Sequence, residues 1–179
     1  MSTNTRSLDY LISIAALALV SIASPSVGEE IIFMSPEWAS QACEAWNQDE
    51  ILTGKLGKWM QNDLDRGYKI MQIYRRDCQE SSPVEMRIED REGSTECVYG
   101  GAVTVEELDK KADYLMFADT NRWQEMGEGK YGPMKAMMFG RLKFKGPKGE
   151  AMGNMGPFGN FLVLTGQVPS NANVCPGVS

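Results

Sequence analysis

The residues of this chain that could act as acids, bases or nucleophiles do not form a catalytic arrangement. The sequence contains no histidine, which removes the commonest general base, the commonest zinc ligand and every Ser-His or Cys-His pair. Neighbouring carboxylates could do acid–base work only if they were buried, where their pKa values would separate. The neighbouring pairs are Asp49-Glu50, Glu89-Asp90 and Glu106-Glu107. Each stands in a turn or cap context, so we expect solvated carboxylates and a protein that is not an enzyme.

An apolar run near the N-terminus indicates export. Residues 11–23 (LISIAALALVSIA) follow Arg6 and precede Pro25 and the acidic pair Glu29-Glu30. The run is short for a transmembrane helix and is typical of a signal peptide. We predict that residues 1–28 are a signal peptide or, if they are not cleaved, an anchor that tethers the protein to a membrane. The expected location is therefore periplasmic or secreted.

Four cysteines follow this leader: Cys43, Cys78, Cys97 and Cys175. None has the C-x-x-C spacing of a redox or zinc site, and with no histidine we expect neither a metal nor a cofactor. An even number of cysteines behind an export signal is typical of an oxidising compartment, so all four are disulfide candidates. Three pairings are possible, and the spacing does not choose among them.

A glycine-rich segment, residues 127–132, formally matches G-x-G-x-x-G. A dinucleotide site would require a strand before it and a helix after it, within a βαβ unit. Here the segment follows a helical stretch, so we expect a mobile loop. The net charge of −6 also disfavours nucleic acid as a partner.

Methionine is unusually frequent, with 12 residues. Met134, Met137 and Met138 are spaced i, i+3 and i+4, so they share one face of a predicted helix. Methionine side chains are flexible and polarizable and therefore adapt to varied apolar ligands. The alternative is that they fill the core. We interpret this face as part of a site for something hydrophobic.

The strand predicted after this helix alternates apolar and basic residues. Leu142 and Phe144 point to one side, and basic residues point to the other. No acidic residue occurs between positions 130 and 149. The basic side of this segment is either an ordinary solvated face or a docking surface for anionic headgroups. The candidate docking residues are Lys135, Arg141, Lys143 and Lys145.

Helices are expected at both ends of the sequence. Ser35-Pro36 is a typical helix start. The apolar face of this first helix consists of Trp38, Ala42, Ala45 and Trp46. A second helix is predicted from Asp49, with Leu52, Leu56, Trp59 and Met60 on one face. The C-terminal half should contain a helix capped by Asp119 or Thr120, one at residues 134–139, and a glycine-interrupted one at residues 149–161.

Period-two alternation in the middle of the chain predicts strands. They cover residues 68–75, 84–89, 95–101, 113–118 and 141–145. Thr104 and Glu107 match a capping box, which predicts a helical turn at residues 105–110. Grouped strands with helices at each end indicate an α+β fold. The length of 179 residues favours a single domain, with a five-stranded, mostly antiparallel sheet covered on one face by helices.

The run YLMFADTNRWQEM…GPMKAMMFGRLKFKG…EAMGNM resembles the sterol-carrier-protein-2 (SCP-2) family. Residues that fall where the family pattern requires them are Pro133, Met134, Ala136, Met137, Gly140, Leu142, Phe144 and Gly146. The opening Ser35-Pro36-Glu37-Trp38 is similar to the first helix of bacterial members. The resemblance covers residues 33–161. We therefore expect an SCP-2-like domain at residues 33–168 and a loose tail at residues 169–179.

The resemblance implies non-enzymatic binding and transfer of fatty acids, sterols or other lipids in an apolar tunnel between sheet and helices. The expected lining is Leu115, Met116, Phe117, Trp123, Met126, Met134, Met137, Met138, Met152, Met155 and Phe158. The expected partners are a hydrophobic small molecule and, transiently, an anionic membrane surface. The alternative is an accessory module that presents a hydrophobic substrate to a partner enzyme or binds a partner protein.

Overall fold

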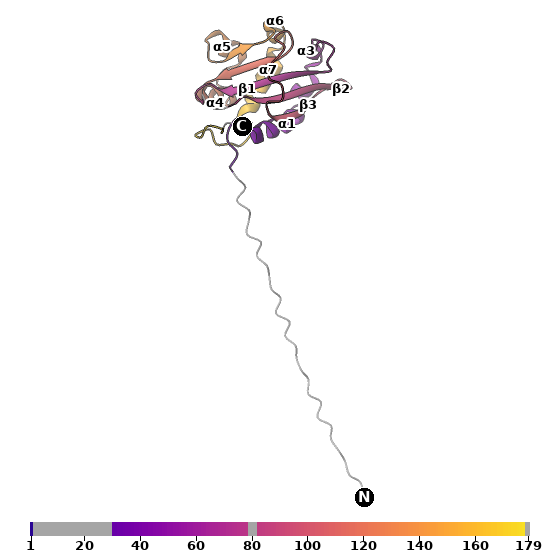
Figure 1. The fold of residues 1–179 in the computed structure, drawn as a ribbon, viewed down its shortest axis with the longest axis vertical. Helices are drawn as coiled ribbons and strands as arrows, with labels where there is room; N and C mark the ends of the chain where they lie inside the picture. Colours follow the sequence, from indigo (N-terminus) through magenta and orange to yellow (C-terminus); the bar gives the residue numbers. More distant parts are fainter. Residues whose placement is uncertain (2–29, 79–81, 178–179) are drawn as a thin grey trace.

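The computed structural model describes residue 1 and residues 30–78 and 82–177 (Figure 1). The predicted signal peptide or anchor, residues 1–28, lies outside the described residues except for Met1. In chain order the elements are α1 (Pro36–Gln48), α2 (Glu50–Gly54), α3 (Gly57–Met60), β1 (Tyr68–Arg75), β2 (Val84–Arg91), β3 (Ser94–Ala102), β4 (Tyr114–Ala118), α4 (Thr120–Gly127), α5 (Pro133–Met138), β5 (Lys143–Lys145), α6 (Lys148–Gly153) and α7 (Met155–Gln167).

The strands form one five-stranded sheet in the order β3-β2-β1-β4-β5. Neighbouring strands are antiparallel except β1 and β4, which run parallel, with Met71 opposite Tyr114 and Ile73 opposite Met116. The parallel pair arises because residues 103–113 carry the chain from the β3 edge across to the far side of β1. The predicted α+β fold with a five-stranded, mostly antiparallel sheet in a single domain is confirmed.

One face of the sheet carries the apolar side chains that pack against the helices. Met71 and Ile73 of β1, Met86 and Ile88 of β2, and Met116 of β4 all belong to the buried core. They alternate with residues of the other face, as the period of a strand requires. Helix α1 packs on β3, and α7 packs on α1 and α4, so the helices form a layer over this face.

The other face of the sheet holds a buried carboxylate, Glu85. Glu85 has no exposed surface and accepts hydrogen bonds from Thr104 Oγ1, from the Val105 amide (3.1 Å) and from Gln72 Nε2 (3.1 Å). The predicted helical turn at residues 105–110 is wrong. The Thr104 hydroxyl, which was expected to cap this turn, donates to the Glu85 carboxylate instead.

Two predicted helices are each divided in two. The segment that begins at Asp49 forms α2, which the Asp49 carboxylate caps by accepting from the Ile51 and Leu52 amides at 2.8 and 3.0 Å. It ends at Gly54, and α3 starts at Gly57. The glycine-interrupted segment breaks at Asn154 between α6 and α7, and α7 continues to Gln167. Both breaks fall beside glycines, which have low helix propensity.

Two disulfides join distant parts of the chain. Cys43 of α1 pairs with Cys97 of β3, and Cys78, just after β1, pairs with Cys175. The loops that they close span 54 and 97 residues. Closing long loops restricts the unfolded chain, so each bond is expected to stabilise the fold by about 2–4 kcal/mol.

Residues 169–177, expected as a loose tail, are held by more than the disulfide at Cys175. Asn171 pairs with Ile32 in a parallel bridge. The buried Arg75 guanidinium donates to the carbonyls of Ala172 and Val174, both at 2.6 Å. These bonds bring the start and the end of the domain together beside the end of β1.

Candidate functional site

An apolar pocket, here called the aromatic cavity, lies between the sheet and the helix layer. Six of its residues carry rings, from α1, α3, β4, β5 and α7, and the rest are mostly aliphatic. Its lining is Trp46, Trp59, Tyr114, Phe144, Phe158 and Phe161, together with Leu52, Leu56, Met71, Met116, Ala151, Asn154 and Pro157. Its volume is about 40 Å³, which is room for water but not for a lipid.

The rings of the aromatic cavity hold one another in place. Trp46 lies 6.2 Å from Phe161 and 6.5 Å from Trp59, measured between ring centroids, and Trp59 lies 5.7 Å from Tyr114. Tyr114 in turn lies 5.2 Å from Phe144. The Trp46 indole is further fixed because its Nε1 donates to the Thr95 carbonyl at 2.9 Å. Such tilted ring pairs are favourable beyond their buried area, so the wall is rigid.

A second pocket, the methionine groove, opens to solvent beside the aromatic cavity. It is lined by Met134, Met137, Met138, Gly140, Leu142, Lys143, Phe144, Lys148, Ala151 and Met152, and its volume is about 450 Å³. Met138 is 71% exposed and Met134 is 44% exposed. Phe144 and Ala151 line both pockets. The groove and the cavity therefore adjoin at these two side chains.

A buried ion pair stands at one end of the aromatic cavity. The Lys69 side chain has no exposed surface, and its Nζ donates to Glu150 Oε1 at 2.5 Å and to the Trp59 carbonyl at 3.0 Å. The Tyr114 hydroxyl donates to the same Glu150 oxygen. The ammonium also lies 4.6 Å from the centroid of the Trp59 ring. Lys69 belongs to β1 and Glu150 to α6, so this contact ties α6 to the sheet.

Burial shifts the proton affinity of both donors. Desolvation lowers the pKa of Lys69, although hydrogen bonding to Glu150 and the charge of Glu150 oppose this effect. The pKa of Tyr114 is raised, first by desolvation and then by its hydrogen bond to Glu150. Tyr114 therefore stays protonated and keeps donating at neutral pH, whereas Lys69 can lose its proton more easily than an exposed lysine.

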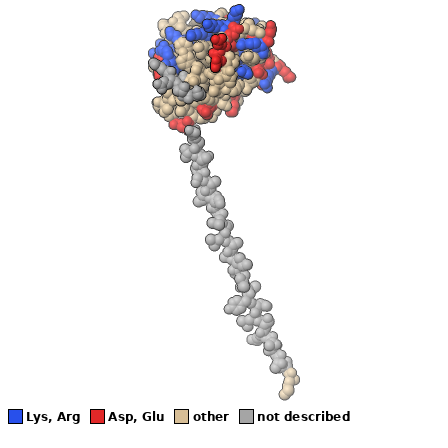
Figure 2. Space-filling view, viewed as in Figure 1, with Lys and Arg blue, Asp and Glu red and all other residues tan. Residues whose placement is uncertain are grey.

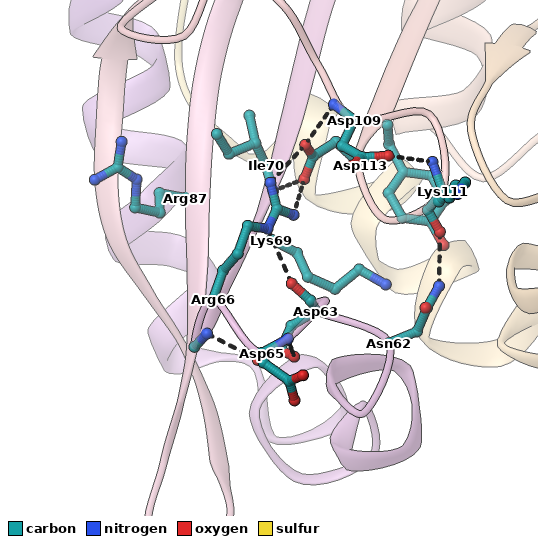
Figure 3. A network of polar contacts seen from close by, with 12 residues as sticks. Asn62, Asp63, Asp65, Arg66, Lys69, Ile70, Arg87, Asp109, Lys111 and Asp113 are labelled. Carbon is teal, nitrogen blue, oxygen red and sulfur yellow. Dashed lines mark hydrogen bonds and ion pairs between the residues drawn. The ribbon is translucent and has the colours of Figure 1, made fainter.

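A polar network at the start of β1 and β4 fixes the backbone that carries these two donors (Figure 3). Asp113 is buried and forms a bidentate ion pair with the Arg66 guanidinium, with N···O distances of 2.7 and 3.0 Å. It also accepts a hydrogen bond from the Ile70 amide at 3.0 Å. Figure 3 shows the Lys69 ammonium pointing away from this pair. The network thus holds residues next to Lys69 and Tyr114 without neutralising the Lys69 charge directly.

Six of the eleven predicted lining residues lie in the two pockets. Met116 and Phe158 line the aromatic cavity, and Met134, Met137, Met138 and Met152 line the methionine groove. Met155 lines neither pocket; it is partly buried and packs against the core. The resemblance implies one tunnel, and the structure has two adjoining pockets in its place.

Four predicted lining residues lie elsewhere. Leu115 and Phe117 point to the sheet face opposite the helices, where the Phe117 ring stacks on Tyr74 with centroids 4.9 Å apart. Trp123 and Met126 are fully buried between α4 and the core, and the Trp123 Nε1 donates to the Tyr74 carbonyl at 3.1 Å. These four residues line neither the aromatic cavity nor the methionine groove, because alternation along β4 and the packing of α4 on α7 turn them away from both pockets.

The sequence did not predict most of the aromatic wall. It also did not predict Lys69 and Tyr114, the two donors to Glu150. The sequence spacing places Trp46 and Trp59 on the apolar faces of two helices, but it does not show that their rings line a cavity. A usable signal was present for Lys69, because it stands in strand residues 68–75 with the same parity as Met71 and Ile73. Period-two alternation places these three side chains on the helix-covered face.

Of the four basic residues proposed for docking, Lys143 lines the methionine groove, whereas Lys145 lines a separate pocket with Leu115 and Glu106 on the sheet face opposite the helices. The Arg141 guanidinium lies 4.5 Å from the centroid of the Tyr131 ring. Figure 2 shows Lys and Arg side chains gathered at the end of the domain where Figure 1 places α5 and α6, with some acidic side chains among them. Within the described part of the chain, Lys135, Arg141, Lys143 and Lys145 form no ion pair.

The glycine-rich segment at residues 127–132 has a packing role. A Cβ on Gly127 would meet the Gly166 Cα at 2.7 Å, so this glycine lets α4 approach α7 closely. The helix that follows, α5, has six residues and no side-chain cap. Among residues 1, 30–78 and 82–177 there is no cluster of potential metal ligands, and no helix has the length and apolar character needed to span a membrane.

Comparison with known proteins identifies relatives at the level of family and fold. Residues 50–159 match the model of the SCP-2 sterol transfer family. A conserved hypothetical protein of Thermus thermophilus, described as a possible sterol carrier protein, is 24% identical, with a TM-score of 0.51 over 77% of this chain and 90% of that one. No curated protein sequence matches this chain.

Two further solved structures are similar over most of their length. A sterol carrier protein 2 is 22% identical, with a TM-score of 0.49 over 75% of this chain and 98% of that one. The apo form of sterol carrier protein 2 from Yarrowia lipolytica is 14% identical, with a TM-score of 0.39 over 73% of this chain and 89% of that one. The likeness to the Thermus thermophilus structure shows the fold, and the aromatic cavity lies between the sheet and the helices of that fold.

Proposed function

Because this chain belongs to the SCP-2 sterol transfer family, we propose that it is a non-enzymatic carrier that binds a lipid in the aromatic cavity and transfers it. The observation that carries this proposal is the adjacency of two apolar pockets that share Phe144 and Ala151. The side chains that line the aromatic cavity are mostly buried, whereas the groove presents the exposed side chains of Met134, Met138 and Met152. A lipid chain could therefore enter from the surface and be buried without crossing polar structure.

The volumes of the two pockets indicate what must move. Sites for small molecules usually measure about 300–1,000 Å³, and the aromatic cavity alone, at about 40 Å³, is far below that range. The methionine groove, at about 450 Å³, lies within it. Joining the two would give a site for a long chain. We propose that α6 and the Phe144 ring move apart to form the apolar tunnel that the family leads us to expect.

Helix α6 is suited to move. It has only six residues, Lys148–Gly153, contains two glycines and lacks a side-chain N-cap. A Cβ on Gly149 or Gly153 would meet no atom within 4 Å, so neither glycine is required by close packing. Short helices are marginal without strong tertiary packing, and elements of low local stability are the ones that open for ligands.

The driving force for binding would be the burial of apolar surface. Each Å² removed from water contributes about 25 cal/mol before the costs of ordering and immobilisation. Met134, Met138 and Met152 are exposed and unbranched, so they can follow the shape of more than one lipid. This flexibility supports a carrier of several hydrophobic ligands and does not name a single one.

The basic side chains beside the groove would direct its opening to an anionic membrane. Each Lys or Arg near such a surface contributes about 1 kcal/mol. Lys135 and Lys143 have no carboxylate partner in the described part of the chain that membrane contact would have to break. The docking surface proposed from the sequence is therefore retained as part of this function.

The proposed compartment is the periplasm or the extracellular space. The two disulfides are consistent with an oxidising environment, because such bonds are rare in reducing compartments. The predicted domain at residues 33–168 would fold and act after export. The leader at residues 1–28 would be either removed or kept as a tether.

A second candidate function, an accessory module for a partner enzyme or protein, is favoured by the exposed apolar side chains. Met134, Met138, Phe139 and Met152 are all at least 44% exposed. Exposed apolar patches mark protein interfaces as well as lipid sites. A stable complex with another protein that retains no lipid would favour this alternative.

The test is to purify the protein from its native host and weigh it intact by native mass spectrometry, followed by lipid extraction. We expect bound lipid and displacement of a fluorescent fatty acid by the extract. A clean mass of the protein alone, together with no binding of the fluorescent probe, would contradict a lipid carrier.

A further inference from the structure

Lys69 is a buried charge at the edge of an apolar cavity. Its side chain is fully buried, and its ammonium lies 4.6 Å from the ring centroid of Trp59 and 5.3 Å from that of Tyr114. Both rings line the aromatic cavity. Burying a charged lysine opposes folding unless it is paired and hydrogen-bonded. An apolar side chain would fill the same place at lower cost, so the charge calls for a functional reason.

Two donors converge at this point on one carboxylate oxygen. Lys69 Nζ and the Tyr114 hydroxyl both donate to Oε1 of Glu150. An ammonium and a hydroxyl aimed at the same oxygen are a recognition site for a carboxylate, because hydrogen bonds to an ionised acceptor are roughly twice as strong as neutral ones. The Trp59 carbonyl accepts from Lys69 at 3.0 Å and helps to orient the ammonium.

The donors are fixed, whereas the acceptor is replaceable. Lys69 and Tyr114 stand on the neighbouring central strands β1 and β4. Glu150 stands on α6, the short glycine-containing helix, and its side chain is 14% exposed. A small outward movement of α6 would carry the Glu150 carboxylate into solvent, where its charge is hydrated. The two donors would remain at the end of the cavity.

We propose that Lys69 and Tyr114 form a binding site for the carboxylate of a fatty acid, which takes the place of Glu150 when the lipid chain fills the aromatic cavity. This inference rests on the proposed function and adds the chemical class of the ligand. One carboxylate replaces another, so the ammonium is neutralised in both states. A neutral lipid cannot make this exchange without leaving the Lys69 charge buried and unpaired.

The same exchange connects ligand binding to opening. Ala151, the residue after Glu150, lines both the cavity and the groove. Release of Glu150 removes the side-chain contact that ties α6 to the sheet and moves Ala151 out of the path of the chain. Burial lowers the pKa of Lys69, and the hydrogen bond and charge of the Glu150 carboxylate oppose this effect, so the buried ammonium needs a carboxylate beside it in either state.

The experiment compares palmitic acid with hexadecanol, which has the same chain length and no charge. Wild-type protein, Glu150→Gln and Lys69→Met are measured by calorimetric titration and by thermal unfolding with and without each lipid. Glu107→Gln, at an exposed acidic residue, and Lys55→Met, at an exposed lysine, are the matched controls. Folding of each variant is checked by circular dichroism.

Glu150→Gln should bind palmitic acid more tightly relative to hexadecanol, on the order of tenfold, because the ligand no longer competes with a carboxylate. Without lipid this variant should unfold at a lower temperature than wild type, since its Lys69 charge has only a neutral partner. Palmitic acid should restore that temperature and hexadecanol should not. Lys69→Met, if it folds, should lose the preference for the acid by a similar factor.

The outcomes separate the two proposals. If hexadecanol and palmitic acid bind wild type and Glu150→Gln with the same ratio of affinities, the carboxylate site is refuted and the lipid carrier stands. The carboxylate site is likewise refuted, and the lipid carrier stands, if both lipids stabilise Glu150→Gln equally. If neither lipid binds any of the proteins, the lipid carrier itself is refuted, and the carboxylate site is refuted with it.

Discussion

The aromatic cavity and the methionine groove are neighbours that share Phe144 and Ala151, yet they are built in opposite ways. The cavity is lined by rings from α1, α3, β4, β5 and α7, which pack on one another at centroid distances of 5.2–6.5 Å. The groove is lined by residues 134–152, largely flexible and partly exposed. One pocket is stiff and assembled from the whole chain, whereas the other is adaptable and local.

This difference teaches how a carrier can be both tolerant and selective. An adaptable entrance accepts many apolar chains, because methionine side chains adjust at small cost. A rigid interior with one fixed cation and one fixed hydroxyl, Lys69 and Tyr114, can discriminate headgroups. In the proposed mechanism the groove collects the lipid and the interior selects it, with α6 as the movable wall between them.

The largest expected effect tests the stiffness of the interior. Phe161→Ala should lower the free energy of unfolding by about 3–5 kcal/mol, because it removes a buried ring from a packed wall. Met138→Ala in the groove should change it by no more than about 0.5 kcal/mol, since that side chain is mostly exposed. Urea denaturation followed by tryptophan fluorescence measures both. Equal losses would remove the contrast between the two pockets.

A titration with alkali tests the charge in the interior. Burial lowers the pKa of Lys69 below the usual lysine value of 10.5, so the ammonium is lost at a lower pH than in an exposed lysine. The groups that act on it are Glu150, Asp113 and Arg66, and Tyr114 remains protonated because its own pKa is raised. Only the protonated form attracts a carboxylate, so the affinity must fall as pH rises through the lowered pKa.

The expected loss in the affinity for palmitic acid corresponds to about 1.5–3 kcal/mol, the worth of a hydrogen bond to a charged group. The affinity for hexadecanol should change little over the same range, because it does not use the charge. Fluorescent-probe displacement at increasing pH, from neutral upward, measures both lipids. A parallel decline for acid and alcohol would mean that the protein unfolds or that Lys69 does not contact the ligand.

A third prediction concerns the wall between the two pockets. Ala151→Phe places a ring where the cavity and the groove meet, and it should slow the association of a fluorescent fatty acid in stopped-flow measurements. Overpacking of this kind also costs about 1–3 kcal/mol of stability. Gly149→Ala is the control on the same helix, because its new methyl group meets open space. Unchanged association with Ala151→Phe would show that the lipid enters by another path.

The smallest expected effect concerns the surface around the groove. Lys143→Glu should weaken binding to vesicles that contain anionic lipid by about 1 kcal/mol. Neutral vesicles should show no difference. Lys55→Glu makes the same change at an exposed residue outside the proposed docking surface and serves as the control. If Lys143 and Lys55 matter equally, the attraction depends on net charge and not on a docking surface.

Much of the fold could be predicted from the sequence, because its signals are local. Period-two alternation identified β1, β2 and β3 to within two residues of their ends, and Ser35-Pro36 marked the start of α1. The methionine spacing identified α5 and the groove residues on it. The predicted turn at residues 105–110 was wrong because Thr104 binds Glu85, a partner that is distant in sequence.

The sequence by itself determined the α+β class, the family resemblance, the lack of histidine chemistry and the methionine face, since each depends on composition or on residues close together in the chain. Only the tertiary structure decided the two disulfide pairings and the aromatic cavity. It also brought Lys69 and Glu150 together from positions 81 residues apart. The reason is physical: a cavity wall and a buried ion pair exist only where folded elements meet, and no local spacing records which elements those are.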